Sequence, residues 1–231
     1  MNQSVQNYPG SAGEGALVAQ RNRVLRNTYW LLALSMVPTV LGAWIGVQTG
    51  IMRGMTGGIG LVVFLVGAFG FMFAIEKFKN SAAGVPILLA FTFFMGLMLA
   101  RLIGAVLGLK NGGELIMTAF AGTGAIFFGM ATLSSVIKRD LSSMGKFLFI
   151  GAIMLLVAMI ANVFIQSSAL MITLSVLAIG IFSAFILYDL KRVQDGEETN
   201  YITATLGVYL SIYNVFSNLL ALLGIFGGER E

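Results

Sequence analysis

Seven long apolar stretches, separated by short polar loops, fill nearly all of the chain from Tyr29 to Phe226. A hydrocarbon core about 30 Å thick needs roughly 20 helical residues to cross it, and each stretch supplies that length. Backbone in lipid must satisfy its own hydrogen bonds, so runs of this length are expected to be helices. The pattern therefore predicts an all-α polytopic membrane protein. Its seven predicted transmembrane helices are Tyr29–Gln48, Gly57–Ile75, Val85–Leu109, Leu115–Ile137, Phe147–Ile165, Leu170–Tyr188 and Tyr201–Phe226.

Composition supports this class and excludes several functions. Only 10% of the residues are charged and 58% are hydrophobic, whereas a soluble domain carries about 25% charged residues. The chain has no cysteine and no histidine, which rules out disulfides, imidazole metal ligands and histidine-activated nucleophiles. The sequence also lacks a glycine-rich phosphate loop, an acidic metal cluster and paired catalytic carboxylates. We therefore expect no enzymatic activity, no cofactor, no bound metal and no nucleic-acid partner.

Lysine and arginine are distributed unevenly between the two sets of loops. Ten lie on one side of the predicted helices and three on the other, while Arg101 falls inside a span. Cytoplasmic loops carry the excess of positive residues in membrane proteins. The N-terminus is therefore expected in the cytosol and, after seven crossings, the C-terminus outside. The ten are Arg21, Arg23, Arg26, Lys77, Lys79, Lys138, Arg139, Lys146, Lys191 and Arg192, and the three are Arg53, Lys110 and Arg230.

Polar segments flank the expected seven-helix domain of residues 29–226. Residues 1–28 are rich in Gly, Ser, Asn and Gln and lack the apolar core of a secretory signal. We expect residues 1–20 to form a largely disordered cytosolic tail and Arg21–Arg26 to lie near anionic headgroups. Two interpretations of this tail stay open: a solvated topology signal, or an exposed segment that a partner or protease grips. Residues 227–231 are expected to form a short external tail.

Glycines recur at a spacing of four residues in two of the predicted helices. Gly42 and Gly46 lie in the first, and Gly104 and Gly108 lie in the third. Such spacing allows close approach of helix backbones. We expect both pairs to serve packing within the molecule rather than dimerisation.

Polar and small residues follow one face of the seventh predicted helix. They are spaced by four, four, three and four positions, which places them within an arc of roughly 80°. Lipid cannot satisfy hydroxyl and amide groups, so this face is expected to meet other helices. Two interpretations stay open, namely hydrogen bonds between helices and the wall of a polar cavity or ion path. The residues are Thr203, Gly207, Ser211, Asn214 and Asn218.

Asp189 ends the sixth apolar stretch, and it also has two interpretations. In the first, it pairs at the interface with Lys191 or Arg192. In the second, Leu190 and Val193 extend the helix by a turn and the carboxylate lies below the headgroups. There it could titrate near physiological pH and act as a proton switch.

Arg101 lies about two-thirds of the way along the third predicted helix. An arginine at the centre of a span costs about 2.5–3.5 kcal/mol on insertion scales. Because this helix is longer than a bilayer requires, the side chain is expected to reach the outer surface rather than a buried partner.

Five segments of the chain resemble a known family. Lys138–Ser142, Tyr188–Asp189 and Tyr209–Phe216 look like the Bax inhibitor (transmembrane Bax inhibitor motif) family. Val24–Tyr29 and Gly196–Ile202 look more narrowly like its bacterial branch of FtsH protease modulators, the YccA type. The resemblance spans about residues 24 to 226. The polar loop within it is specific, because hydrophobicity does not dictate its sequence.

The resemblance implies a fold in which six helices surround the seventh. In several members of the family, two aspartates on the sixth and seventh helices share a proton and gate a pH-dependent Ca²⁺ leak. Asp189 matches the first of these positions, and Ser211, which is not ionisable, occupies the second. Without a second carboxylate there is no like-charge pair. The resemblance to this switch is therefore incomplete, and Asp189 could instead hydrogen-bond Ser211 or Asn214.

The branch-level resemblance implies a non-enzymatic protein of the bacterial inner membrane that binds the membrane-anchored AAA protease FtsH. It would restrain the attack of FtsH on membrane substrates, in the lipid bilayer and alongside membrane regulators associated with the protease. The alternative is a pH-sensitive Ca²⁺ or H⁺ leak channel. That function would use Asp189 and the polar face of the seventh helix, with Ser211, Asn214 and Asn218 lining a cavity. Arg101 is a further candidate for such a site.

Overall fold

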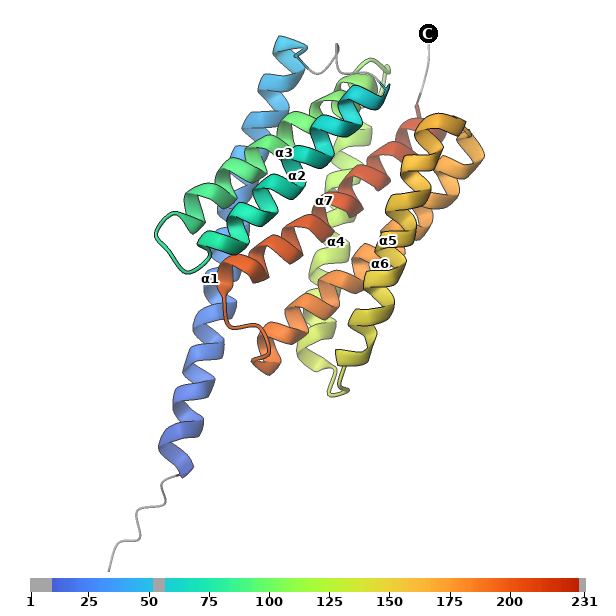
Figure 1. Ribbon diagram of the computed structural model, residues 1–231. Coiled ribbons are helices and arrows are strands. Elements are labelled where there is room, and N and C mark those ends of the chain that lie inside the picture. Colours follow the sequence, from blue (N-terminus) through green and yellow to red (C-terminus); the bar gives the residue numbers. More distant parts are fainter. Residues whose placement is uncertain (1–9, 52–56, 229–231) are drawn as a thin grey trace, which may run out of the picture.

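The computed structural model describes residues 10–51 and 57–228, and within them the chain is all-α (Figure 1). Seven helices are long and apolar enough to cross a membrane, so the number and type of elements predicted from hydropathy are confirmed. They are α1 (Gly10–Thr49), α2 (Gly57–Phe78), α3 (Gly84–Leu107), α4 (Gly112–Val136), α5 (Ser142–Ile165), α6 (Ser168–Asp195) and α7 (Tyr201–Phe226).

The last helix has the most enclosed position in the bundle. No residue of α7 from Tyr201 to Gly224 is exposed, and α7 contacts α1, α2, α3, α4 and α6. Among the described residues α5 makes no contact with α7 and packs mainly against α6. The main core cluster joins Phe91 and Met95 of α3 to Val208 and Tyr209 of α7.

Glycines bring α1 and α3 into close backbone contact. A Cβ at Gly42 would collide with the carbonyl oxygen of Phe93, and one at Gly96 would collide with the carbonyl oxygen of Thr39. Gly46 faces α3 in the same way one turn further along. Backbones that approach this closely gain dispersion energy along the whole interface, which substitutes for the hydrophobic driving force missing in lipid.

The second glycine pair, Gly104 and Gly108, does not bring two helices into close contact. Nothing lies within 4 Å of a Cβ built at Gly104, and at Gly108 the only neighbours within that distance are carbonyl oxygens of α3 itself. The expectation of internal packing is therefore met at Gly42 and Gly46 and wrong at Gly104 and Gly108. The physical reason is that α1 stops at Thr49 and does not cover the last turns of α3.

The first helix begins well before the membrane span predicted for it. The predicted disordered tail covers residues 1–20, of which the structure describes 10–20, and these are helical and continuous with α1. The prediction is wrong there because Ala16, Leu17 and Ala19 are good helix formers, and an existing helix extends without a new nucleus. The extension projects beyond the bundle in Figure 1, and the side chains from Gly15 to Arg23 are all exposed.

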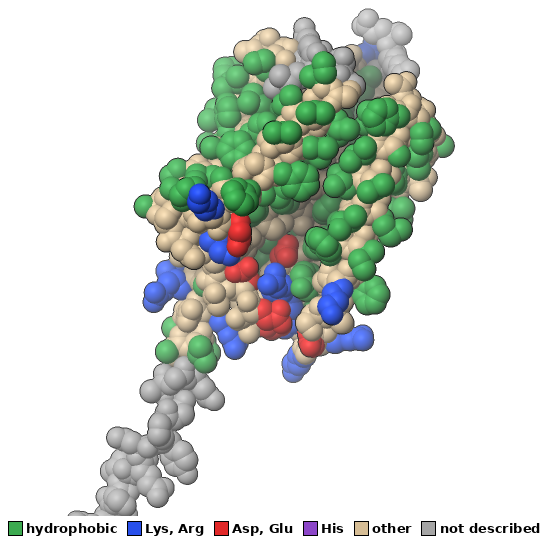
Figure 2. Space-filling view, viewed as in Figure 1, with side chains coloured by type: hydrophobic (Ala, Val, Ile, Leu, Met, Phe, Trp, Pro, Cys, Tyr) green, Lys and Arg blue, Asp and Glu red, His purple; other side chains and the backbone are tan. Residues whose placement is uncertain are grey.

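Charged side chains gather at the end of the bundle from which α1 projects (Figure 2). We call this the polar end, and it carries the α2–α3, α4–α5 and α6–α7 turns. Asn200 links two of these turns, because its amide donates to the carbonyl of Lys79 and to Oδ1 of Asn80. In the α4–α5 turn the backbone N–H of Ser142 donates to Asp140 and lowers the pKa of that carboxyl.

Candidate functional site

Near the polar end of α6, two consecutive side chains pack onto glycines of the two neighbouring helices. A Cβ at Gly207 of α7 would lie 2.9 Å from Oδ2 of Asp189, and one at Gly145 of α5 would collide with the Tyr188 hydroxyl. The Arg192 guanidinium carbon lies 5.6 Å from the centre of the Tyr188 ring. The Tyr188–Asp189 pair thus fixes this part of α6 between α5 and α7.

Asp189 has no direct ionic partner among the residues that the structure describes. Lys191 pairs with Asp195, with Nζ to Oδ1 at 2.7 Å, and Arg192 lies 3.6 Å from Glu197. The helix continues past the carboxylate to Asp195, as the second interpretation of Asp189 required. The aspartate therefore lies within α6, two turns before its end, and not in an interfacial ion pair.

Two charged groups come near Asp189 without pairing with it. They are Arg192, one turn ahead on the same helix, and Glu198 of the α6–α7 turn. Leu190 and Val193, which follow Asp189 on the same helix, are completely buried. The Asp189 carboxylate therefore lies beside Gly207 in apolar surroundings. The second acidic residue near it is Glu198 of the α6–α7 turn and not a residue of α7.

The seventh-helix residues predicted as a site do not hydrogen-bond Asp189. The Asn214 amide donates to the Leu210 carbonyl at 2.8 Å, and the Asn218 amide donates to the Asn214 carbonyl at 2.8 Å. Ser211 is buried, and its hydroxyl has no hydrogen bond to a described residue. Within the described chain, the polar stripe therefore bonds to its own helix and not to neighbouring helices.

Hydrogen bonds between α7 and other helices are made by residues that the sequence reasoning missed. The Tyr209 hydroxyl lies 2.9 Å from Oγ1 of Thr39 in α1 and 3.4 Å from the Thr92 carbonyl in α3. Thr205 reaches the Thr28 carbonyl at 3.4 Å. Their spacing of four residues is a usable signal, but both lie on a different face of α7 from the predicted stripe.

Arg101 lies at the opposite end of the bundle from Asp189. The side chain is exposed and forms no ion pair or hydrogen bond with a described residue. It stands six residues before the end of α3 at Leu107, which is about 9 Å along the helix axis. The structure therefore separates Arg101 from the other predicted site residues, and its reach to the outer membrane surface stays a prediction.

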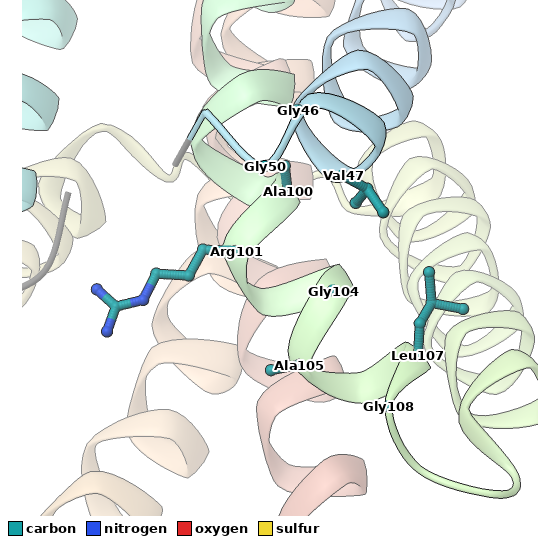
Figure 3. Close-up of a pocket in the computed structure, with 9 residues that line it drawn as sticks. All are labelled: Gly46, Val47, Gly50, Ala100, Arg101, Gly104, Ala105, Leu107 and Gly108. Carbon is teal, nitrogen blue, oxygen red and sulfur yellow. The ribbon is translucent and has the colours of Figure 1, made fainter. Parts of the chain in front are cut away.

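A shallow cavity of about 450 Å³ lies beside Arg101 between the ends of α1 and α3 (Figure 3). Gly46 of α1 and Gly50, just after its end, line one side, and Gly104 of α3 and Gly108, just after its end, line the other. The guanidinium extends away from Gly104 and Gly108 in Figure 3. Arg101 also lines the cavity and is the charged residue among the residues that line it.

Groups able to hold a metal ion are absent from the described residues, since no three acidic, histidine or cysteine side chains come together there. The half-buried carboxylate of Asp189 against Gly207 and the polar stripe of α7 beside it are the chemical features of this part of the bundle.

Comparison with known proteins gives a consistent result. A family model described as inhibitor of apoptosis-promoting Bax1 matches residues 21–228. An uncharacterized membrane protein of Vibrio cholerae is 36% identical over 214 residues, which cover 91% of this chain and 92% of that protein. The modulator of FtsH protease YccA of Escherichia coli K12 is 36% identical over 203 residues, which cover 88% and 90%. The same values apply to the inner membrane protein YccA of E. coli O6:H1.

Proposed function

The chain belongs to the Bax inhibitor family, and from that premise we propose that it binds the membrane AAA protease FtsH and restrains it. The observation that carries this proposal is the similarity to a named FtsH modulator along nearly the full length of both chains. The region that the family model matches, residues 21–228, includes the polar segment Gly196–Ile202, whose Asn200 caps α7 and joins two turns of the polar end. The role is non-enzymatic.

The chain is a multi-pass protein of the bacterial inner membrane, with seven candidate spans and a relative named as an inner membrane protein. We propose that the polar end faces the cytosol, because ten of the fourteen lysines and arginines lie at that end, in its turns and in the adjoining parts of the helices. The projecting part of α1 then stands in the compartment where an AAA protease engages its substrates.

The mechanism is competition. The helices dock beside the membrane anchors of the protease, where regulators associated with it also assemble. The segment before Arg21 meanwhile offers a slow substrate to the cytosolic entrance. The exposed side chains of Gly15–Arg23 support this role. This part of α1 is held to the bundle where Arg21 donates to the Gln194 carbonyl near the end of α6, and Val24 packs next to it on Val193 of α6 and Ala204 of α7.

Reconstituted proteolysis tests the proposal. FtsH and a known membrane substrate are incorporated in liposomes with and without this protein, and the rate of substrate cleavage is measured. Slower cleavage together with co-purification of the two proteins is expected. A variant lacking residues 1–20 should still bind FtsH, through its helices, but should itself be degraded more slowly by the protease. Unchanged degradation of that variant would contradict the role assigned to the tail.

A second function has one observation in its favour. Asp189 is held inside the bundle without an ion pair to a described residue, beside a polar stripe whose Ser211 is also without a partner there. A cation leak would use both groups. Ca²⁺ and H⁺ flux into liposomes should then depend on pH and fall in Asp189→Asn, while Asp140→Asn, in an exposed turn, serves as control. Flux that does not respond to either change would remove this function.

A further inference from the structure

One face of α7 is not fully covered by the other helices. Its side chains are only half-buried, and they lie within an arc of roughly 120° about the helix axis. In Figure 1 α7 passes between α2 and α5, and neither of them crosses it. We call this the open face of α7. Its members include Thr203, Gly207, Leu210, Tyr213, Asn214 and Ser217.

The helices on either side leave this face accessible from the bilayer. Among the described residues α5 does not contact α7, and α2 makes few contacts with α7 or with α5. Both flanking helices are exposed and apolar along much of their length, as Phe69 and Phe73 of α2 and Phe147 and Ile150 of α5 illustrate. Figure 2 shows hydrophobic side chains along both sides of the opening. The open face is therefore polar, and the helices on both sides of it carry apolar side chains suited to contact with lipid.

Lipid is a poor partner for the open face of α7, because this face carries polar groups whose hydrogen bonds acyl chains cannot satisfy. The amide of Asn214 and the hydroxyl of Ser217 bond only to backbone carbonyls of α7. Oδ1 of Asn214 and the hydroxyl of Tyr213 accept or donate no hydrogen bond to a described residue. Asp189 lies at the edge of the same face, against Gly207, and also has no ionic partner there.

The dimensions suit one helix. From Thr203 to Ser217 the open face is about 21 Å long, or four turns, and Gly207 allows a neighbouring backbone to approach closely. We infer that the open face of α7 is the docking site for a transmembrane helix of the partner protease. That helix would present hydrogen-bonding and small side chains to Asn214 and Tyr213, and a basic side chain near its cytosolic end to Asp189. This inference rests on the proposed function and names the surface that performs it.

Site-specific photo-crosslinking tests the inference in cells that contain both proteins. A photoreactive phenylalanine analogue replaces Leu210 of the open face, which removes no polar group. The matched control is Phe128 of α4, which is 68% exposed and lies eight residues from the polar end of its helix, as Leu210 lies nine from the polar end of α7. We expect a covalent product with FtsH, identified by mass spectrometry within one of its membrane helices, from position 210 and not from position 128.

Two substitutions give an independent readout in purified protein. Leu210→Trp fills the opening and should weaken FtsH binding at least about tenfold, while Phe128→Trp should leave it unchanged. If FtsH co-purifies but position 210 yields only lipid adducts or a second copy of this chain, the docking site is overturned and the proposed function stands. If FtsH does not co-purify at all, both are overturned.

Discussion

Gly207 is the residue on which the position of Asp189 depends most directly. A methyl group at position 207 would lie 2.9 Å from the carboxylate oxygen, so Gly207→Ala must displace Asp189 or separate α6 from α7. We expect a loss of roughly 1–3 kcal/mol in unfolding free energy, as for other overpacked sites. Unfolding in mixed micelles, followed by circular dichroism, measures the loss.

The double variant Gly207→Ala/Asp189→Ala provides the decisive comparison. Removing the carboxylate should recover most of the loss, because the two residues are in contact and their effects are not additive. Gly104→Ala is the control, since open space surrounds that position and alanine favours the helix. Additive losses in the double variant would contradict the contact.

Asn200 has two structural tasks at the polar end. Its side-chain oxygen accepts from the backbone of Ile202 and Thr203 at the start of α7, and its amide donates to the α2–α3 turn. Asn200→Ala should therefore cost about 1–2 kcal/mol. Asn200→Asp keeps the capping oxygen and should recover part of the loss. Equal losses in the two variants would show that the cap contributes little.

Some properties of single residues were predictable from the sequence and others were not, for a physical reason. The exposure of Arg101 was predictable, because it depends only on hydration cost and on distance from the helix end. The contacts of Tyr188 with Gly145 and of Asp189 with Gly207 were not, because they depend on how three helices face one another. The same reason explains why Thr205 and Tyr209, and not the predicted stripe, bond to other helices.

At the scale of helices, the α1–α3 interface depends on glycine. Gly96→Leu would push a side chain into the backbone of α1 at Thr39, and backbone cannot rotate away as a side chain does. We expect a loss of about 3 kcal/mol or more. Gly104→Leu changes the same residue type on the same helix where nothing lies within 4 Å, and it should cost less than about 1 kcal/mol. Comparable losses from both would contradict the interface.

The existence of each helix was predictable from hydropathy, but several ends were not. α5 begins five residues before its predicted start, and α6 ends seven residues after its predicted end. Hydropathy falls at Lys191 and Arg192, although both are good helix formers, so the helix continues until Gly196 takes a positive φ of 83°. Helix ends follow backbone capping, whereas membrane spans follow transfer energy.

For the molecule as a whole, the absence of cysteine makes orientation directly measurable. Single cysteines at Lys79 and Lys110 place one thiol at each end of the bundle. A membrane-impermeant maleimide, applied to spheroplasts, should label Lys110→Cys and leave Lys79→Cys unlabelled until the cells are lysed. The reverse pattern would invert the proposed topology and would remove the tail from the compartment of the protease active sites.

The 40 residues of α1 form one continuous helix about 60 Å long, and its length has a mechanical consequence. A motor that pulls on the N-terminus loads this rod along its axis. The first resistance comes where Arg21 and Val24 contact the end of α6 and the start of α7. The next comes from the α1–α3 interface, where Gly42 and Gly96 allow the two backbones to pack directly against each other. All contacts along such an interface are sheared together rather than peeled one by one. The proposed function therefore predicts slow extraction, during which the motor would be withheld from other substrates.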